Sequence, residues 1–66
     1  MSPTYPDVTV QLTGTDGNAF AVMGTVAAAI RAAHGSREAD SYVAEAMDQP
    51  SYDALLGFTM ATVHVR

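Results

Sequence analysis

The chain has 66 residues and no cysteine, so the sequence predicts one small domain without disulfides or thiolate metal ligands. Hydrophobic residues make up 48% of it, which is enough for a packed core and excludes a disordered composition. Three arginines and no lysine stand against seven acidic residues, giving a net charge of −4. Phosphate backbones are bound through clustered Lys and Arg, so this composition argues against a nucleic-acid partner.

Residues 1–6 contain two prolines and are predicted to form a flexible N-terminal tail ahead of a single domain over residues 7–66. The tail has neither the basic residues nor the apolar stretch of a signal peptide. The apolar-rich residues 19–33 are interrupted and too short to span a bilayer. We therefore expect a cytoplasmic protein with no membrane partner.

Alternating residues predict a first strand, in which Val8, Val10 and Leu12 share the buried face. Residues 14–18 are then predicted to form a turn, where Gly17 can take a positive φ. Two glycines ahead of a helix resemble a phosphate-binding loop. However, the lysine of such a loop is missing and Asp16 adds negative charge, so we expect a plain turn.

Three helices are predicted next from apolar residues at helical spacing. Asn18 is the expected N-cap of the first helix, and Gly35 is its expected left-handed C-terminal residue. Ser36 and Ser51 are expected to cap the second and third helices, which Pro50 separates. Gly24 is expected to allow close packing of another element. The residues expected to face inward are Phe20, Val22, Met23, Val26, Ala27 and Ile30, then Ala39, Tyr42 or Val43, Ala46 and Met47, then Leu55, Leu56, Thr59 and Met60.

The period changes from 3.6 to 2 near Ala61, which predicts a second strand with Val63 and Val65 inward and Thr62, His64 and Arg66 in water. The fold class is therefore α+β, a small β-α-α-α-β domain with its two terminal strands paired and packed under three helices. The pairing can be parallel or antiparallel. Each strand is also an edge that can pair with another chain.

Three segments carry a resemblance that covers nearly the whole chain: residues 5–12, the junction at residues 14–21, and residues 52–56 leading to residues 63–65. The most specific piece is the Asp-Gly-Asn-Ala-Phe sequence that joins the turn to the helix. The chain resembles a family of short uncharacterised proteins from actinobacterial phages and mobile elements. The resemblance implies a phage or plasmid context and no mechanism.

Residues that could carry chemistry are sparse. His34 and His64 are the only imidazoles and stand thirty residues apart, whereas a zinc site needs three or four ligands. His34 is expected to cap a helix C-terminus and His64 to face solvent, where a neighbouring Asp would make a pH-sensitive contact. The aspartates sit at turns, and a chain this short has little room for a ligand pocket. We expect no enzyme, no catalytic residue, no cofactor and no metal.

The remaining hypothesis is a small non-enzymatic protein-interaction or regulatory module, acting on a protein partner or by self-association. Its expected partner-binding residues are Tyr52, Phe58, Glu38 and Glu45. Two alternatives stay open. One is a nucleic-acid-associated regulator, in which a dimer pools Arg31 and Arg37. The other is an acidic decoy that binds a host enzyme, for which Asp and Glu should gather on one face.

Overall fold

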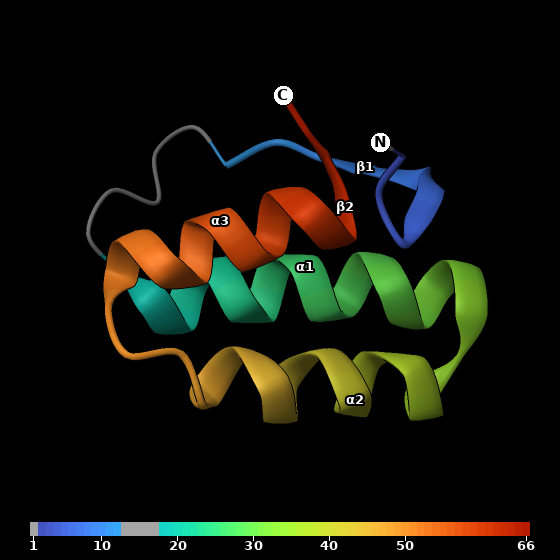
Figure 1. Ribbon diagram of the computed structural model, residues 1–66. Coiled ribbons are helices and arrows are strands. Elements are labelled where there is room, and N and C mark those ends of the chain that lie inside the picture. The colour runs from blue at the N-terminus through green and yellow to red at the C-terminus, as the bar shows by residue number, and fades with distance from the viewer. Residues whose placement is uncertain (1, 13–17) are drawn as a thin grey trace.

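The computed structural model describes residues 2–12 and 18–66 and shows an α+β domain (Figure 1). The predicted fold class and element order are confirmed, while the predicted turn at residues 14–17 lies outside the described residues. Figure 1 shows α1 running between α2 on one side and α3 with the strands on the other. The elements are β1 (Tyr5–Val10), α1 (Ala19–His34), α2 (Ser36–Met47), α3 (Tyr52–Thr62) and β2 (Val63–Val65).

The two strands pair in parallel, which settles the open question of their direction. Tyr5 lies opposite Val63 and Val10 opposite Val65, with an irregularity in the register after Tyr5. Pro6 falls in this irregular part, where a residue without an N–H is tolerated. Parallel strands need a long crossover connection, and the three helices supply it. The strand β1 begins at Tyr5, so the last two residues of the predicted tail, Tyr5 and Pro6, belong to this strand.

Backbone hydrogen bonds extend the strand pairing at both ends. The N–H of Thr4 donates to the carbonyl of Ala61 (3.1 Å), and the N–H of Arg66 donates to the carbonyl of Val10 (2.9 Å). The first of these bonds anchors a residue that was assigned to the tail. Both termini consequently lie beside the sheet, on the α3 side of the domain (Figure 1).

The strand faces follow the predicted alternation only in part. Val8, Val10 and Val63 are buried, and Leu12 packs partly covered against the core. Val65 was expected inward but is 36% exposed. Thr62 was expected in water but ends α3 as a buried residue, and its hydroxyl donates to the carbonyl of Phe58 (2.8 Å). The helix therefore includes Thr62, one residue more than the alternating pattern suggests, and the bond satisfies a buried hydroxyl within the helix.

Helix α1 is the common support of the fold, since α2, α3 and β1 all pack against it. Its N-terminus is closed by Asn18, whose Oδ1 accepts from the N–H of Ala21 (3.0 Å), as predicted. Its C-terminus ends at Gly35 with φ +100°, also as predicted, and the Gly35 N–H bonds to the carbonyl of Arg31 (2.9 Å). The innermost side chains of α1 are fully covered, namely Val22, Val26 and Ile30.

The caps of the other two helices differ in kind. Ser51 caps α3 as predicted, because its Oγ accepts from the N–H of Ala54 (3.1 Å). The predicted cap of α2 was wrong: Ser36 is already the first helical residue, and the preceding Gly35 has no side chain to form a cap. One glycine in the left-handed region therefore ends α1 and begins α2.

A buried hydrogen bond joins α2 to α3. The hydroxyls of Tyr42 and Thr59 lie 2.8 Å apart, and both residues are almost completely covered. The ring of Phe58 stacks on Tyr42 with centroids 5.6 Å apart and an interplanar angle of 9°. Burial raises the pKa of the Tyr42 hydroxyl above its ordinary value of 10.0, so it stays protonated and able to donate. The joint combines apolar packing with one satisfied polar pair.

Three large apolar residues predicted to face inward are exposed: Phe20 by 77%, Met47 by 65% and Met60 by 61%. On α2, the buried residues Ala39, Tyr42 and Ala46 define a narrow stripe, and at about 100° per residue Met47 lies roughly 110° from its centre. The prediction for Gly24 was also wrong, because no atom lies within 4 Å of the place that a Cβ would take there.

Replacing Thr59 by Val should destabilise the protein, because the buried hydroxyl of Tyr42 loses its partner while the volume hardly changes. We expect a loss of about 1–3 kcal/mol in the free energy of unfolding, measured by denaturant titration. The double variant Tyr42→Phe/Thr59→Val removes both hydroxyls and should recover much of this loss. A Thr59→Val protein as stable as the wild type would show that the bond contributes nothing.

Alanine substitutions at glycines should act in opposite directions. Gly24→Ala and Gly57→Ala place a methyl group in open space on a helix and should raise stability by about 0.5–1 kcal/mol each. Gly35→Ala should lower stability by about 1 kcal/mol, because φ at this position is +100°. Thermal unfolding of the three variants measures the contrast, and a neutral Gly35→Ala would contradict the assigned turn.

Candidate functional site

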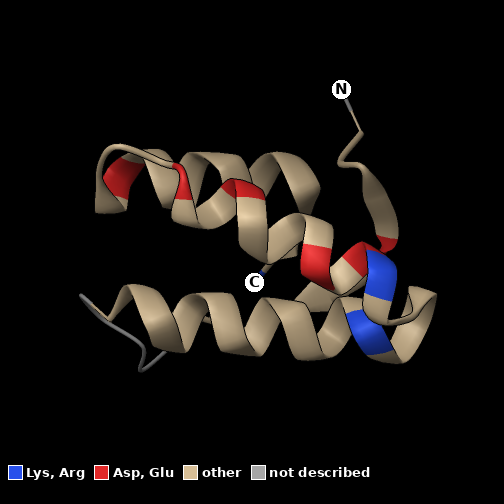
Figure 2. Cartoon of the chain, turned by 90° about the horizontal axis from the view of Figure 1, so that it is seen from below, with Lys and Arg blue, Asp and Glu red and all other residues tan. Residues whose placement is uncertain are grey.

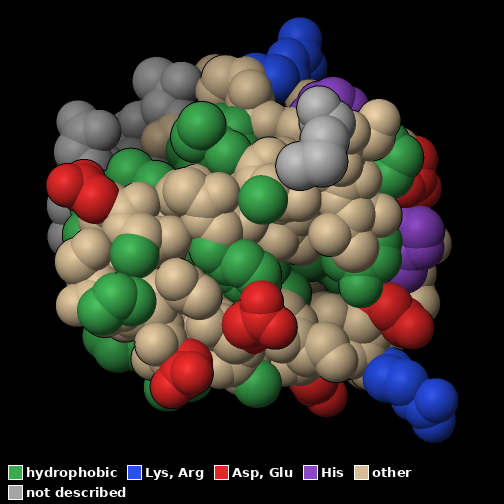
Figure 3. Space-filling model, in the orientation of Figure 1, with side chains coloured by type: hydrophobic (Ala, Val, Ile, Leu, Met, Phe, Trp, Pro, Cys, Tyr) green, Lys and Arg blue, Asp and Glu red, His purple; other side chains and the backbone are tan. Residues whose placement is uncertain are grey.

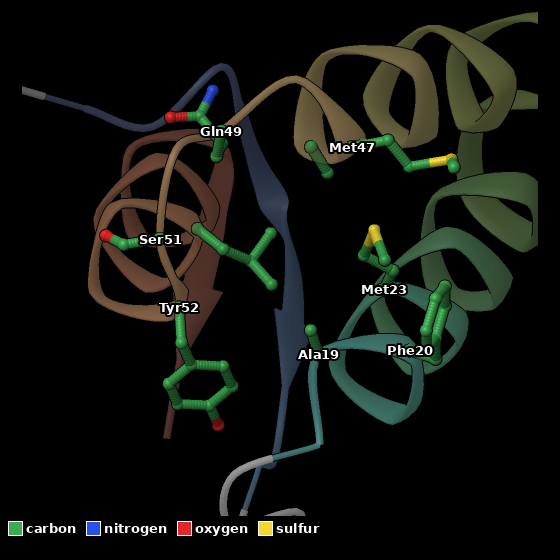
Figure 4. Close-up of a pocket in the computed structure, with 9 residues that line it drawn as sticks. Ala19, Phe20, Met23, Met47, Gln49, Ser51 and Tyr52 are labelled. Carbon is green, nitrogen blue, oxygen red and sulfur yellow. The ribbon is translucent and has the colours of Figure 1, made fainter.

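An apolar cleft of about 290 Å³ opens where the start of α1 meets the end of α2 and the start of α3 (Figure 4). In this view Phe20 and Met23 come from α1, Met47 comes from the end of α2, and Tyr52 stands across the cleft on α3. Among the residues that the structure describes, none of those lining it is charged. The lining residues are Ala19, Phe20, Met23, Ala46, Met47, Gln49, Ser51, Tyr52 and Leu55.

The connection between α2 and α3 holds the cleft in shape. The N–H groups of Asp48 and Gln49 donate to the carbonyls of Glu45 and Ala46 (both 3.2 Å). The side-chain amide of Gln49 donates to the same Glu45 carbonyl (3.2 Å), so the end of α2 is closed by its own chain. Pro50 then stops the helix, and α3 begins beyond Ser51. Buried residues such as Leu55 form the floor of the cleft.

The rim of the cleft is apolar and accessible. Phe20 and Met47 are two of the most exposed large hydrophobic residues of the described chain, and both line the same cleft. Single exposed apolar residues are ordinary on protein surfaces, whereas a contiguous group marks an interaction site. Methionine is also flexible enough to adapt to the shape of a partner. This arrangement is suited to binding an apolar side chain rather than to acid–base chemistry.

A second, more open hollow shares Met47 with the cleft. It is lined by Ser41, Ala44, Glu45, Met47 and Asp48. Met47 is therefore shared by the apolar cleft and by a hollow that holds two carboxylates. Figure 3 shows the same mixture on the face seen in Figure 1, where acidic side chains lie among small hydrophobic patches and basic side chains lie at the edges.

The charges of the molecule are unevenly distributed. Acidic residues follow α2 and reach the start of α3, whereas Arg31 and Arg37 lie together at the opposite end, where α1 turns into α2 (Figure 2). Arg37 and Met47 are ten residues apart on one helix, which corresponds to about 15 Å. The charged residues described beside the cleft are therefore acidic, namely Glu45 and Asp48.

The four residues predicted to bind a partner do not form one site. Tyr52 lines the apolar cleft, and Glu45 lines the acidic hollow. Phe58 is half-buried against Tyr42 and shares a smaller hollow of about 140 Å³ with Glu45. Glu38 is half-buried at the start of α2, with its carboxylate beside Gly35, and lines none of these hollows. The sequence reasoning missed Phe20 and Met47 because it placed both in the core.

The sequence predicted that His34 would cap the C-terminal carbonyls of α1, but its side chain bonds elsewhere. Its Nε2 donates to Oδ1 of Asp7 (3.0 Å), and the ring of Tyr5 lies against it with centroids 4.8 Å apart. Such a contact with Asp was considered from the sequence only for His64, and the structure forms one at His34. His–Asp pairs orient the base in nucleophilic catalysis. No hydroxyl of the described residues is hydrogen-bonded to His34.

Neither a metal cluster nor a membrane span is found in the described part of the chain. Over residues 2–12 and 18–66, no three His, Asp or Glu side chains lie close enough to hold a metal ion. No helix in those ranges has both the length and the apolar character needed to cross a membrane.

No protein-family model, curated protein or solved structure matches this chain. The resemblance to proteins of actinobacterial phages and mobile elements therefore stays a prediction. The site has to be interpreted from its own geometry.

The contact between Asp7 and His34 should make stability depend on pH. The hydrogen bond from His34 lowers the pKa of Asp7 below its ordinary value of 3.8. A carboxyl with a lowered pKa in the folded state stabilises the fold above the unfolded-state pKa of about 3.9, and this contribution disappears as pH falls through the folded-state pKa. His34→Asn should raise the pKa of Asp7 in an NMR titration, whereas His64→Asn should not. An unchanged Asp7 titration in His34→Asn would contradict the contact.

Proposed function

We propose that the protein is a non-enzymatic protein-interaction module that binds an apolar side chain of a partner protein in the cleft between α1, α2 and α3. The supporting observation is that Phe20 and Met47, 77% and 65% exposed, border one apolar cleft. A regulatory role in the cytoplasm, in the mobile-element context that the resemblance implies, is part of this proposal.

The size of the effect is consistent with a module that binds reversibly. Covering Phe20 and Met47 would contribute roughly 2–4 kcal/mol, since each is already partly covered. Micromolar affinity corresponds to about −8 kcal/mol. Two apolar anchors are therefore not sufficient alone, and the polar rim has to supply further contacts. Gln49 can use its side-chain carbonyl and Ser51 the hydrogen of its hydroxyl, because the bonds of these residues to Glu45 and Ala54 use other atoms.

The alternative functions leave the apolar cleft without a role. A nucleic-acid regulator would use Arg31 and Arg37, which the structure places at the other end of the molecule (Figure 2). Even a dimer would pool only four arginines, too few for a strong phosphate-binding surface. An acidic decoy would use the carboxylates along α2 but not the exposed Phe20 and Met47. Protein binding through the cleft accounts for the exposure of Phe20 and Met47 and for the apolar cleft that they border.

The proposal predicts that Met47→Ser weakens partner binding while Met60→Ser does not. Met60 is exposed to a similar degree but does not line the cleft, so it is a matched control. The probe is a library of displayed random peptides, selected on the wild-type protein. We expect the selected peptides to bind Met47→Ser about tenfold more weakly, a change of about 1.4 kcal/mol. Both variants should keep the stability of the wild type to within about 0.5 kcal/mol.

Two results would contradict the proposal. One is a selection that enriches no peptide above background. The other is a set of peptides that bind the wild type, Met47→Ser and Met60→Ser equally well, because their site would then lie elsewhere on the surface.

A further inference from the structure

We propose that the partner segment at the cleft is basic and amphipathic, with an apolar side chain in the cleft and a Lys or Arg side chain in the adjoining acidic hollow. This inference rests on the proposed function and adds the chemistry of the partner to it. It is drawn from the observation that Met47 lines both depressions.

The two depressions are close enough for neighbouring side chains of one segment. Met47 lines both, so the apolar cleft and the acidic hollow adjoin at a single side chain. Residues three or four apart on a helix have Cβ atoms about 5–6 Å apart, and residues two apart on a strand are only slightly further separated. An apolar residue followed at such a spacing by Lys or Arg can therefore occupy both depressions at once.

The carboxylates of the hollow are available to a partner. Glu45 and Asp48 are both exposed, and neither carboxylate makes a hydrogen bond or an ion pair with residues that the structure describes. The arginines of the described chain that lie on its helices, Arg31 and Arg37, are at the far end of α2 (Figure 2). A Lys or Arg side chain of a partner therefore does not compete with Arg31 or Arg37 for the carboxylates of Glu45 and Asp48.

Charge also decides against two other occupants of the cleft. A second copy of this chain, docked through the same end, would bring two Glu45 and two Asp48 side chains towards each other, and like charges in an interface are costly. An acidic segment would meet the same repulsion. A segment with Lys or Arg beside its apolar anchor is instead attracted by the carboxylates of Glu45 and Asp48.

The experiment begins from the peptides selected on the wild-type protein and measures their affinities at 0.15 M salt. The double variant Glu45→Gln/Asp48→Asn removes the charge of the hollow without changing its shape. The control Glu38→Gln removes a charge from the same helix, about 10 Å along its axis from Glu45 for residues seven apart. This distance exceeds the Debye length of about 8 Å, so the control should change affinity less than twofold.

We expect the selected peptides to carry Lys or Arg within four positions of their apolar anchor, and Glu45→Gln/Asp48→Asn to bind them about tenfold more weakly. Replacing those basic residues by Gln should cause a similar loss in the wild type and none in the double variant. Peptides that bind the cleft but show no basic preference would overturn this inference and leave the proposed function standing. A dimer of the protein that is lost in Met47→Ser, measured by sedimentation equilibrium, would also overturn it, since a second copy would then be the occupant.

Discussion

The buried hydrogen bond between Tyr42 and Thr59 sets the relation of α2 to α3, and the cleft depends on that relation. Both hydroxyls are removed from water, so each satisfies the other, and sliding one helix along its neighbour would leave both without a partner. Phe58 stacks on Tyr42 and adds apolar contact at the same joint. With the two helices fixed here, the end of α2 and the start of α3 remain apart at the side where the cleft opens.

A domain of this size has little stability to spare, which makes its exposed apolar residues informative. Helix α1 uses its fully buried residues Val22, Val26 and Ile30 to hold the other elements together. The two parallel strands, which lie near the two ends of the chain, pair beside this core. Phe20 and Met47 contribute little to that packing and border a cleft instead. Large apolar side chains at a cleft rim are most simply explained by a partner that covers them.

Local features of the sequence predicted local features of the fold. Asn18, Ser51 and Gly35 bond to backbone groups within four residues of them in the chain. The structure places all three at helix ends, as predicted. Other errors arose where contacts between distant segments determine the structure. The contact of His34 with Asp7 spans 27 positions, and the cleft is formed by the ends of three helices. A stricter helical projection would have placed Met47 outside the buried stripe of α2, but nothing local reveals that Tyr52 faces it across the cleft.

The most direct test of the account is to map a selected peptide onto the protein by the amide chemical shifts of the ¹⁵N-labelled chain. The account predicts that shifts change at the cleft and its acidic neighbour, with the largest changes at Phe20, Met47, Asp48 and Tyr52. Shift changes confined to the strands β1 and β2, or to the corner that holds Arg31 and Arg37, would place the binding surface elsewhere and contradict it.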